Sequence, residues 1–165
     1  MGGGILPIVI KDGNIYFLFS RESMYVNKTE DWRDFGGTPE KKETTKETAI
    51  REGWEESMGF LGDKKNIKQL IENHTVYVSK KGKYTTFVVD IKMTKKHWEL
   101  PKKFREHYMK MFNKDKSKIS EKGFYEKDKL MWLKLENLNK KFKMFKPWYR
   151  EIVKDIYYHF KQLKN

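Results

Sequence analysis

The stretch from residue 36 to residue 60, GGTPEKKETTKETAIREGWEESMGF, constrains the fold more than any other part of the chain. It opens on a glycine pair, and the sequence TTKE that begins at Thr44 has the form of a capping box. In such a box, the side chains of Thr44 and Glu47 each accept a hydrogen bond from the other residue's backbone N–H. This pattern predicts a helix that begins after Thr44, runs to about Met58 and ends at Gly59. We therefore expect a loop, a helix and a second loop in this order.

The segments on both sides of this stretch alternate between strand-like and helix-like patterns. Apolar runs at 5–12 and 15–22 flank a Gly-Asn turn and predict a β-hairpin, and Pro7 predicts an edge position or a bulge in its first strand. Further strands are expected at about 31–35, 68–79, 83–93 and 128–135, a basic helical segment at about 96–113, an exposed loop at 114–123, and an amphipathic helix at about 147–163. No repeat or Ser/Pro-rich linker divides the chain, so residues 1–165 are expected to form one mixed α/β domain.

The charge balance of the 165-residue chain is strongly basic, with 36 Lys+Arg against 23 Asp+Glu and a formal net charge of +13. Such a balance attracts phosphate-rich partners, including nucleic acids and polyphosphorylated small molecules. Only five of the basic residues are Arg, however, and phosphate recognition favours the bidentate fork of Arg over Lys. Coding bias toward Lys is therefore an alternative explanation, and charge alone does not choose between the two.

Several classes of protein are excluded by composition. The chain has no cysteine, which excludes a disulfide framework and Cys-ligated zinc or iron–sulfur sites. No apolar run approaches the ~20 residues of a membrane-spanning helix, and no secretory signal is visible at the start. We expect a cytoplasmic protein without a membrane partner.

Three glutamates of the expected helix, Glu52, Glu55 and Glu56, stand at positions i, i+3 and i+4 and so share one helix face. Clustered carboxylates repel one another unless a cation neutralises them, and a hard divalent cation prefers oxygen ligands. Because the preceding glycines allow a close approach of the backbone, their carbonyl groups could add ligands. The alternative is a solvated acidic helix face, which is the commonest fate of a Glu-rich run.

This stretch resembles the signature box of the Nudix hydrolase family. Gly37 is followed by five residues and Glu43, then by seven residues and Arg51-Glu52, and then by Glu55-Glu56, so every charged position of the box is present. Two features depart from the family pattern. Gly53 occupies an apolar position, which removes a side chain from the contact between helix and core and weakens the helix by ~1 kcal/mol relative to Ala. The closing segment, which ends at Phe60, is one residue longer than in the family.

The resemblance implies both a fold and a chemistry. It implies an α/β/α sandwich with a mixed central sheet, and hydrolysis of a nucleoside diphosphate linked to another moiety with Mg²⁺ or Mn²⁺. Glu52 and Glu56 would be the main metal ligands, Glu55 a further ligand, and the Gly37 carbonyl oxygen would complete the set. Glu43 and Arg51 would form the salt bridge that orients the box.

The general base is left open by the sequence. Glu52 or Glu55 could take the proton from the attacking water, while many members of the family use a glutamate from a late loop. Glu126 is the best placed candidate of that kind and Glu121 the second, although a glutamate in a charged loop is usually solvated.

Residues around the glycine pair are candidates for substrate binding. Trp32 and Phe35 could stack on a nucleobase or pack in the core. Arg21 and Arg33 could meet substrate phosphates or be solvated surface charges.

The substrate itself is predicted from the charge. A capped 5′ end of RNA would use an extended basic field, so mRNA decapping is the favoured function. Nucleoside triphosphates, nucleotide sugars, dinucleoside polyphosphates and diphosphoinositol polyphosphates form the alternative. A catalytically idle RNA-binding domain is the third hypothesis, and the intact glutamate set argues against it.

Overall fold

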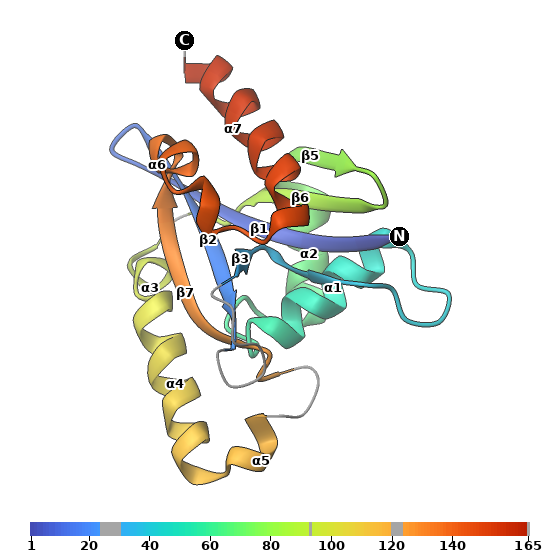
Figure 1. Ribbon diagram of the computed structural model, residues 1–165, viewed down its shortest axis with the longest axis vertical. Helices are drawn as coiled ribbons and strands as arrows, with labels where there is room; N and C mark the ends of the chain where they lie inside the picture. The colour runs from blue at the N-terminus through green and yellow to red at the C-terminus, as the bar shows by residue number, and fades with distance from the viewer. Residues whose placement is uncertain (24–30, 93, 120–123, 165) are drawn as a thin grey trace.

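The computed structural model describes residues 1–23, 31–92, 94–119 and 124–164. Its centre is a mixed sheet with the strand order β3-β2-β1-β6-β5, in which β4 also pairs with β1 and β7 with β2 (Figure 1). The pairing of β1 with β6 is parallel and the other pairings are antiparallel. The strands are β1 (Gly2–Lys11), β2 (Asn14–Glu22), β3 (Trp32–Arg33), β4 (Phe35–Gly37), β5 (Thr75–Lys81), β6 (Tyr84–Asp90) and β7 (Lys127–Lys134).

Helices cover both faces of this sheet, and Figure 1 shows α6 and α7 above it and α1, α4 and α5 below it. The helices are α1 (Thr45–Glu56), α2 (Lys64–His74), α3 (Lys95–Trp98), α4 (Leu100–Lys114), α5 (Lys116–Ile119), α6 (Leu135–Lys140) and α7 (Arg150–Lys164), with 3-10 turns η1 (Phe142–Met144) and η2 (Pro147–Tyr149). The structure therefore confirms the expected fold class, an α/β/α sandwich around a mixed sheet.

Alternation along the strands divides the core into two layers. In β1, Ile5 and Val9 belong to the cluster that includes residues of α1, α2 and α4, whereas Leu6 and Ile8 belong to the cluster that includes residues of α6 and α7. Successive strand residues point to opposite faces, so one strand supplies both layers. The glutamate-rich helix α1 therefore packs on the layer that contains Ile5 and Val9.

The helix α1 has the capping box that the sequence predicts. The Thr44 side chain accepts from the Glu47 N–H, and the Glu47 carboxylate accepts from the Thr44 N–H. Residue 56 is the last of the helix, slightly earlier than expected, because Met58 and Gly59 both have positive φ values, of 52° and 76°. The left-handed conformation at these two positions ends the helix.

The packing of α1 explains why a glycine, Gly53, stands at the position where the family has an apolar residue. A Cβ atom at Gly53 would lie 2.8 Å from Cγ2 of Ile5 and 3.6 Å from the Ile67 side chain. The side chains of β1 and α2 thus fill the space that an apolar residue would take. The partly buried Trp54 packs at the edge of the same layer, with its ring centroid 4.6 Å from that of Phe124.

The edge position predicted for Pro7 was wrong, because β1 is a central strand. Residues 3–5 of β1 pair with β4, and residues 8–11 pair with β2 on the same side. Pro7 lies between these two stretches, where β1 changes partner, while its other side follows β6 opposite Val89. The missing N–H therefore falls where the ladder is interrupted, which is the reason that a proline is tolerated there.

The strand expected over 68–79 is in fact the end of α2 followed by β5. Asp63 and Asn66 form a second capping box, and Ile67 and Ile71 are buried one turn apart. The β-branched run at 75–79 masked the helical spacing that precedes it. Residues 116–119 of the expected loop form the short α5, and residues 120–123 lie outside the described part of the chain.

The C-terminal amphipathic helix is shorter than expected, because residues 147–149 form the turn η2 and α7 follows it. Ile152, Ile156 and Phe160 are buried, as an amphipathic helix requires, but two apolar residues at the ends of the expected range are not: Trp148 is 46% exposed and Leu163 68% exposed. In the described ranges, no helix combines the length and apolar character that crossing a membrane requires.

Candidate active site

A pocket of about 520 Å³ opens where the glycine loop, α1 and the start of β7 meet. Its walls come from segments that are far apart in the sequence, because the sheet brings β4 and β7 to the same end of α1. The lining residues are Arg33, Gly36, Gly37, Thr38, Pro39, Glu40, Arg51, Glu52, Glu55 and Glu126.

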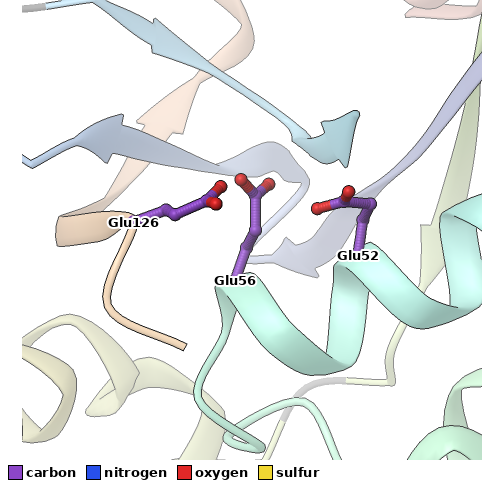
Figure 2. Close-up of side chains that lie close together, drawn as sticks. All are labelled: Glu52, Glu56 and Glu126. Carbon is purple, nitrogen blue, oxygen red and sulfur yellow. The ribbon is translucent and has the colours of Figure 1, made fainter. Parts of the chain in front are cut away.

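Three carboxylates converge here, two in the pocket lining (Glu52 and Glu126) and one buried beside it (Glu56), and Figure 2 shows them pointing toward one another. Glu52 and Glu56 come from successive turns of α1, and Glu126 comes from the segment immediately before β7. One oxygen of each lies within 4.8 Å of the other two. The late-loop glutamate that the sequence singled out is thus placed beside the box, whereas Glu121 lies outside the described residues.

Glu56 is the most deeply buried member of this cluster. Its Oε1 accepts a 2.7 Å hydrogen bond from the Gly36 N–H, while Nη2 of Arg33 and Nζ of Lys127 stand 3.9 and 4.0 Å from its carboxylate oxygens. Burial raises the pKa of Glu56 to about 8, and the two cations only partly oppose this effect. A carboxylate cluster that is buried and only partly neutralised fits a divalent cation with oxygen ligands.

Arg51 organises the other acidic residues of the box. It forms a bidentate ion pair with Glu43, with Nε–Oε2 and Nη2–Oε1 distances of 2.8 and 2.9 Å. Its Nη1 also donates to Glu52 at 2.9 Å and to Glu55 at 3.3 Å. Hydrogen bonds from Arg51 lower the pKa of Glu43 to about 2, whereas burial raises the pKa values of Glu52 and Glu55. Glu55 lines the pocket but is not a member of the convergent group of three.

The glycine at position 37 allows the loop to pass directly against a carboxylate. A Cβ atom at Gly37 would lie 2.5 Å from Oε1 of Glu52. Any side chain at this position would therefore displace one of the three converging carboxylates.

The four residues proposed for substrate binding have separate locations. Arg33 lines the pocket, close to Glu56. Arg21 is absent from the lining, and its guanidinium forms a bidentate pair with Asp128 at 2.9 and 3.2 Å. Trp32 and Phe35 are 7% and 0% exposed and belong to the two core layers, so the core interpretation of these aromatics is correct and stacking on a nucleobase is not open to them.

Two residues near the site were missed by sequence reasoning. Lys127 is fully buried beside Glu56, and its Nζ donates no hydrogen bond within the described residues. Trp148 is half-exposed, and its ring centroid lies 5.6 Å from Cζ of Arg33. No local pattern signals either residue, since Lys127 lies in a charged run and Trp148 lies at the start of the expected amphipathic helix at 147–163.

Sequence comparison matches part of the chain to an uncharacterized protein. No family model matches the chain. A 69-residue stretch is 41% identical to the uncharacterized protein L534 of Acanthamoeba polyphaga mimivirus, and it covers 39% of this chain and 22% of that protein. The chain thus matches about a fifth of the length of this relative.

Comparison with solved structures identifies the fold. The structure resembles that of RenU, a Nudix hydrolase from M. smegmatis, with a TM-score of 0.58 and 14% identity over 99% of this chain and 87% of that one. It also resembles a C. elegans Ap4A hydrolase (TM-score 0.56, 14% identity, 98% and 97% covered) and a mutT/nudix family protein from Listeria innocua (0.53, 13%, 98% and 93%). The chain has the fold of the Nudix hydrolases.

Proposed function

We propose that this chain is a divalent-metal-dependent hydrolase that cleaves a nucleoside diphosphate linked to another moiety. The observation that carries the proposal is the convergence of Glu52, Glu56 and Glu126 in a Nudix fold, with Glu52 and Glu126 in the lining of the pocket. The family box in the sequence and the bidentate pair of Glu43 with Arg51 support the same assignment.

The three convergent carboxylates would hold Mg²⁺ or Mn²⁺. When bound, such an ion neutralises charge on the phosphates and lowers the pKa of a coordinated water. Glu55 faces the same pocket without belonging to the cluster, so we assign to it the acceptance of the water proton. We therefore expect Glu55→Gln to lose kcat and to retain its affinity for Mn²⁺, whereas Glu52→Gln should lose both.

Arg33 and Trp148 are the residues that we assign to the substrate. Arg33 lines the pocket and can donate to a phosphate oxygen, and Trp148 offers an exposed ring next to that guanidinium. Stacking on an aromatic ring is worth about 1–3 kcal/mol per base. A Trp148→Ala variant with the KM of the wild type would contradict this assignment.

Two substrate classes are each favoured by one observation. The net charge of +13 favours the capped 5′ end of RNA, because a polyanion can use a basic surface beyond the pocket. The likeness to an Ap4A hydrolase favours dinucleoside polyphosphates. An idle RNA-binding domain is disfavoured because all the box glutamates are retained.

The substrate class is tested by a hydrolysis panel with Mg²⁺ and Mn²⁺. Cap-labelled RNA is compared with Ap4A, nucleoside triphosphates, nucleotide sugars and diphosphoinositol polyphosphates. Release of labelled nucleoside diphosphate from RNA alone would support decapping. Faster turnover of the small molecules would assign the enzyme to the second class.

The metal site is tested by Glu56→Gln in the same panel. The Gln side chain still offers an oxygen to the Gly36 N–H, so folding is expected to survive while Mn²⁺ affinity and turnover fall by about 10²-fold or more. Glu72→Gln, on the exposed surface of α2, is the matched control and should change neither quantity. Wild-type turnover by Glu56→Gln would remove the metal assignment.

A further inference from the structure

The start of β7, which carries Glu126, departs from regular strand geometry. Arg21 of β2 pairs with Lys129, but the next residue, Glu22, pairs with Lys127, so the register shifts here and β7 holds one residue more than β2, Asp128. As a result, Lys127 and Asp128 are both buried although they are consecutive. A bulge of this kind bends the strand and redirects its side chains. The direction of Glu126 is therefore not set by the sheet ladder alone.

Two residues of α4 support this irregular segment, Arg105 by a direct hydrogen bond and Tyr108 through Ser23. The Ser23 N–H donates to the Glu126 carbonyl oxygen at 2.7 Å, and the Ser23 hydroxyl shares a buried 2.6 Å hydrogen bond with the hydroxyl of Tyr108. Nη1 of Arg105 donates to the Asp128 carbonyl oxygen at 3.0 Å. Both Tyr108 and Arg105 lie on α4, which runs beside β7 (Figure 1).

The same helix also contacts the end of the box. The ring of Phe60 packs edge-on against Phe104 and against His107, with centroid separations of 5.9 and 5.8 Å. Phe104 and Tyr108 are buried and lie one turn apart. Hence α4 touches both segments that supply carboxylates, the box on one side and the start of β7 on the other.

We propose that α4 supports the metal site, and that its residues Tyr108 and Arg105 are positioning residues that keep Glu126 opposite Glu52 and Glu56. This inference rests on the proposed metal site. Neither residue touches the cluster, and each acts through the backbone that carries Glu126. Loss of such supporting partners typically lowers metal affinity or activity by about 10–100-fold, because the ligand loses its orientation.

The test compares two tyrosines that each lose one hydroxyl. Tyr108→Phe removes the bond to Ser23, and Tyr77→Phe removes a 2.9 Å bond to Asp155 on the α7 side of the sheet. Binding of Mn²⁺ alone is measured by calorimetry, together with the unfolding midpoint and, for a hydrolysed substrate, kcat and KM separately. A purely structural role would affect the two variants alike.

We expect Tyr108→Phe to bind Mn²⁺ about tenfold more weakly than the wild type and to lose kcat with little change in KM. Tyr77→Phe should keep the Mn²⁺ affinity and the kcat of the wild type. In a Glu126→Gln background the Tyr108→Phe change should have no further effect on Mn²⁺ affinity, because the hydroxyl acts through Glu126. Ser23→Ala should reproduce Tyr108→Phe, and the double variant should be no weaker than either single one.

Wild-type Mn²⁺ affinity in Tyr108→Phe, or an equal loss in Tyr77→Phe, would overturn the inference. So would a full additional loss in the Glu126→Gln background. A wild-type chain that binds Mn²⁺ but hydrolyses nothing would contradict the proposed activity alone, and the Mn²⁺ titrations would still decide the role of α4. A wild-type chain that binds no Mn²⁺ would overturn both.

Discussion

At the scale of single residues, the site is shaped by places where a side chain is absent. Gly37 leaves room for the Glu52 carboxylate, and Gly53 leaves room for Ile5 and Ile67 against α1. Helix propensity alone predicts that alanine would improve position 53 by ~1 kcal/mol. The structure reverses this expectation, because a Cβ atom there would lie 2.8 Å from a branched side chain of the neighbouring strand.

We therefore predict that Gly53→Ala destabilises the fold. Overpacking of a close contact costs about 1–3 kcal/mol, which exceeds the gain in helix propensity. A net loss of about 1 kcal/mol corresponds to an unfolding midpoint lower by about 2–4 °C. Calorimetric melting of the wild type and of Gly53→Ala measures this difference in midpoint. A variant midpoint above that of the wild type would contradict the prediction and would show that α1 can move away from β1.

At the scale of elements, the loop before α1 is fastened to the helix by the bidentate pair of Glu43 with Arg51. Hydrogen bonds from Arg51 lower the pKa of Glu43 from its ordinary 4.5 to about 2. A carboxylate whose pKa is lower in the folded state stabilises the fold fully above its unfolded pKa. That contribution is lost as the pH falls from about 4.5 toward 2.

The predicted consequence concerns Glu43→Gln. This variant should melt about 2–4 °C below the wild type at neutral pH, and the difference should shrink between pH 4.5 and 2. Melting curves across that range provide the measurement. A difference that is constant with pH would show that the ionised form of Glu43 is not what fastens the loop.

At the scale of the whole molecule, one group of basic residues lies along the connection from α6 to α7. A hollow of about 460 Å³ is lined there by residues 139–144, among them Lys140, Lys141 and Lys143. Arg150 and Lys154 stand over the ring of Phe142, at 5.9 and 5.4 Å. This basic connection leads through η2 to Trp148, which contacts Arg33 at the pocket.

If RNA is the substrate, its affinity should depend steeply on salt. Release of counterions from several phosphates predicts a loss of at least about tenfold between roughly 50 and 200 mM salt. The affinity for Ap4A, which contacts few cations, should change far less. Filter binding of capped RNA to Glu56→Gln measures the slope, and equally weak slopes for both ligands would favour coding bias as the origin of the lysines.

The sequence predicts some elements of the fold and of the site correctly and others wrongly. The capping box of α1, the i, i+4 spacing of Glu52 and Glu56, the first hairpin and β7 all follow from residues close together in the chain. The end of α2 was misassigned, because its short helical pattern merges with the β-branched run of β5. The predicted edge position of Pro7 was also wrong, since the position of a strand in the sheet depends on which strands flank it.

The sequence by itself determined the box and its helix, because hydrogen bonds of the i to i+3 and i to i+4 type join residues that are neighbours in the chain. Only the tertiary structure decided that Glu126 and Lys127 lie beside Glu56, that Arg33 enters the pocket, and that Trp32 and Phe35 do not. These contacts depend on the pairing of β2 with β7, whose Arg21 and Asp128 are 107 residues apart. Pairing over such a distance is selected by burial and register of the whole sheet, and no local pattern carries that information.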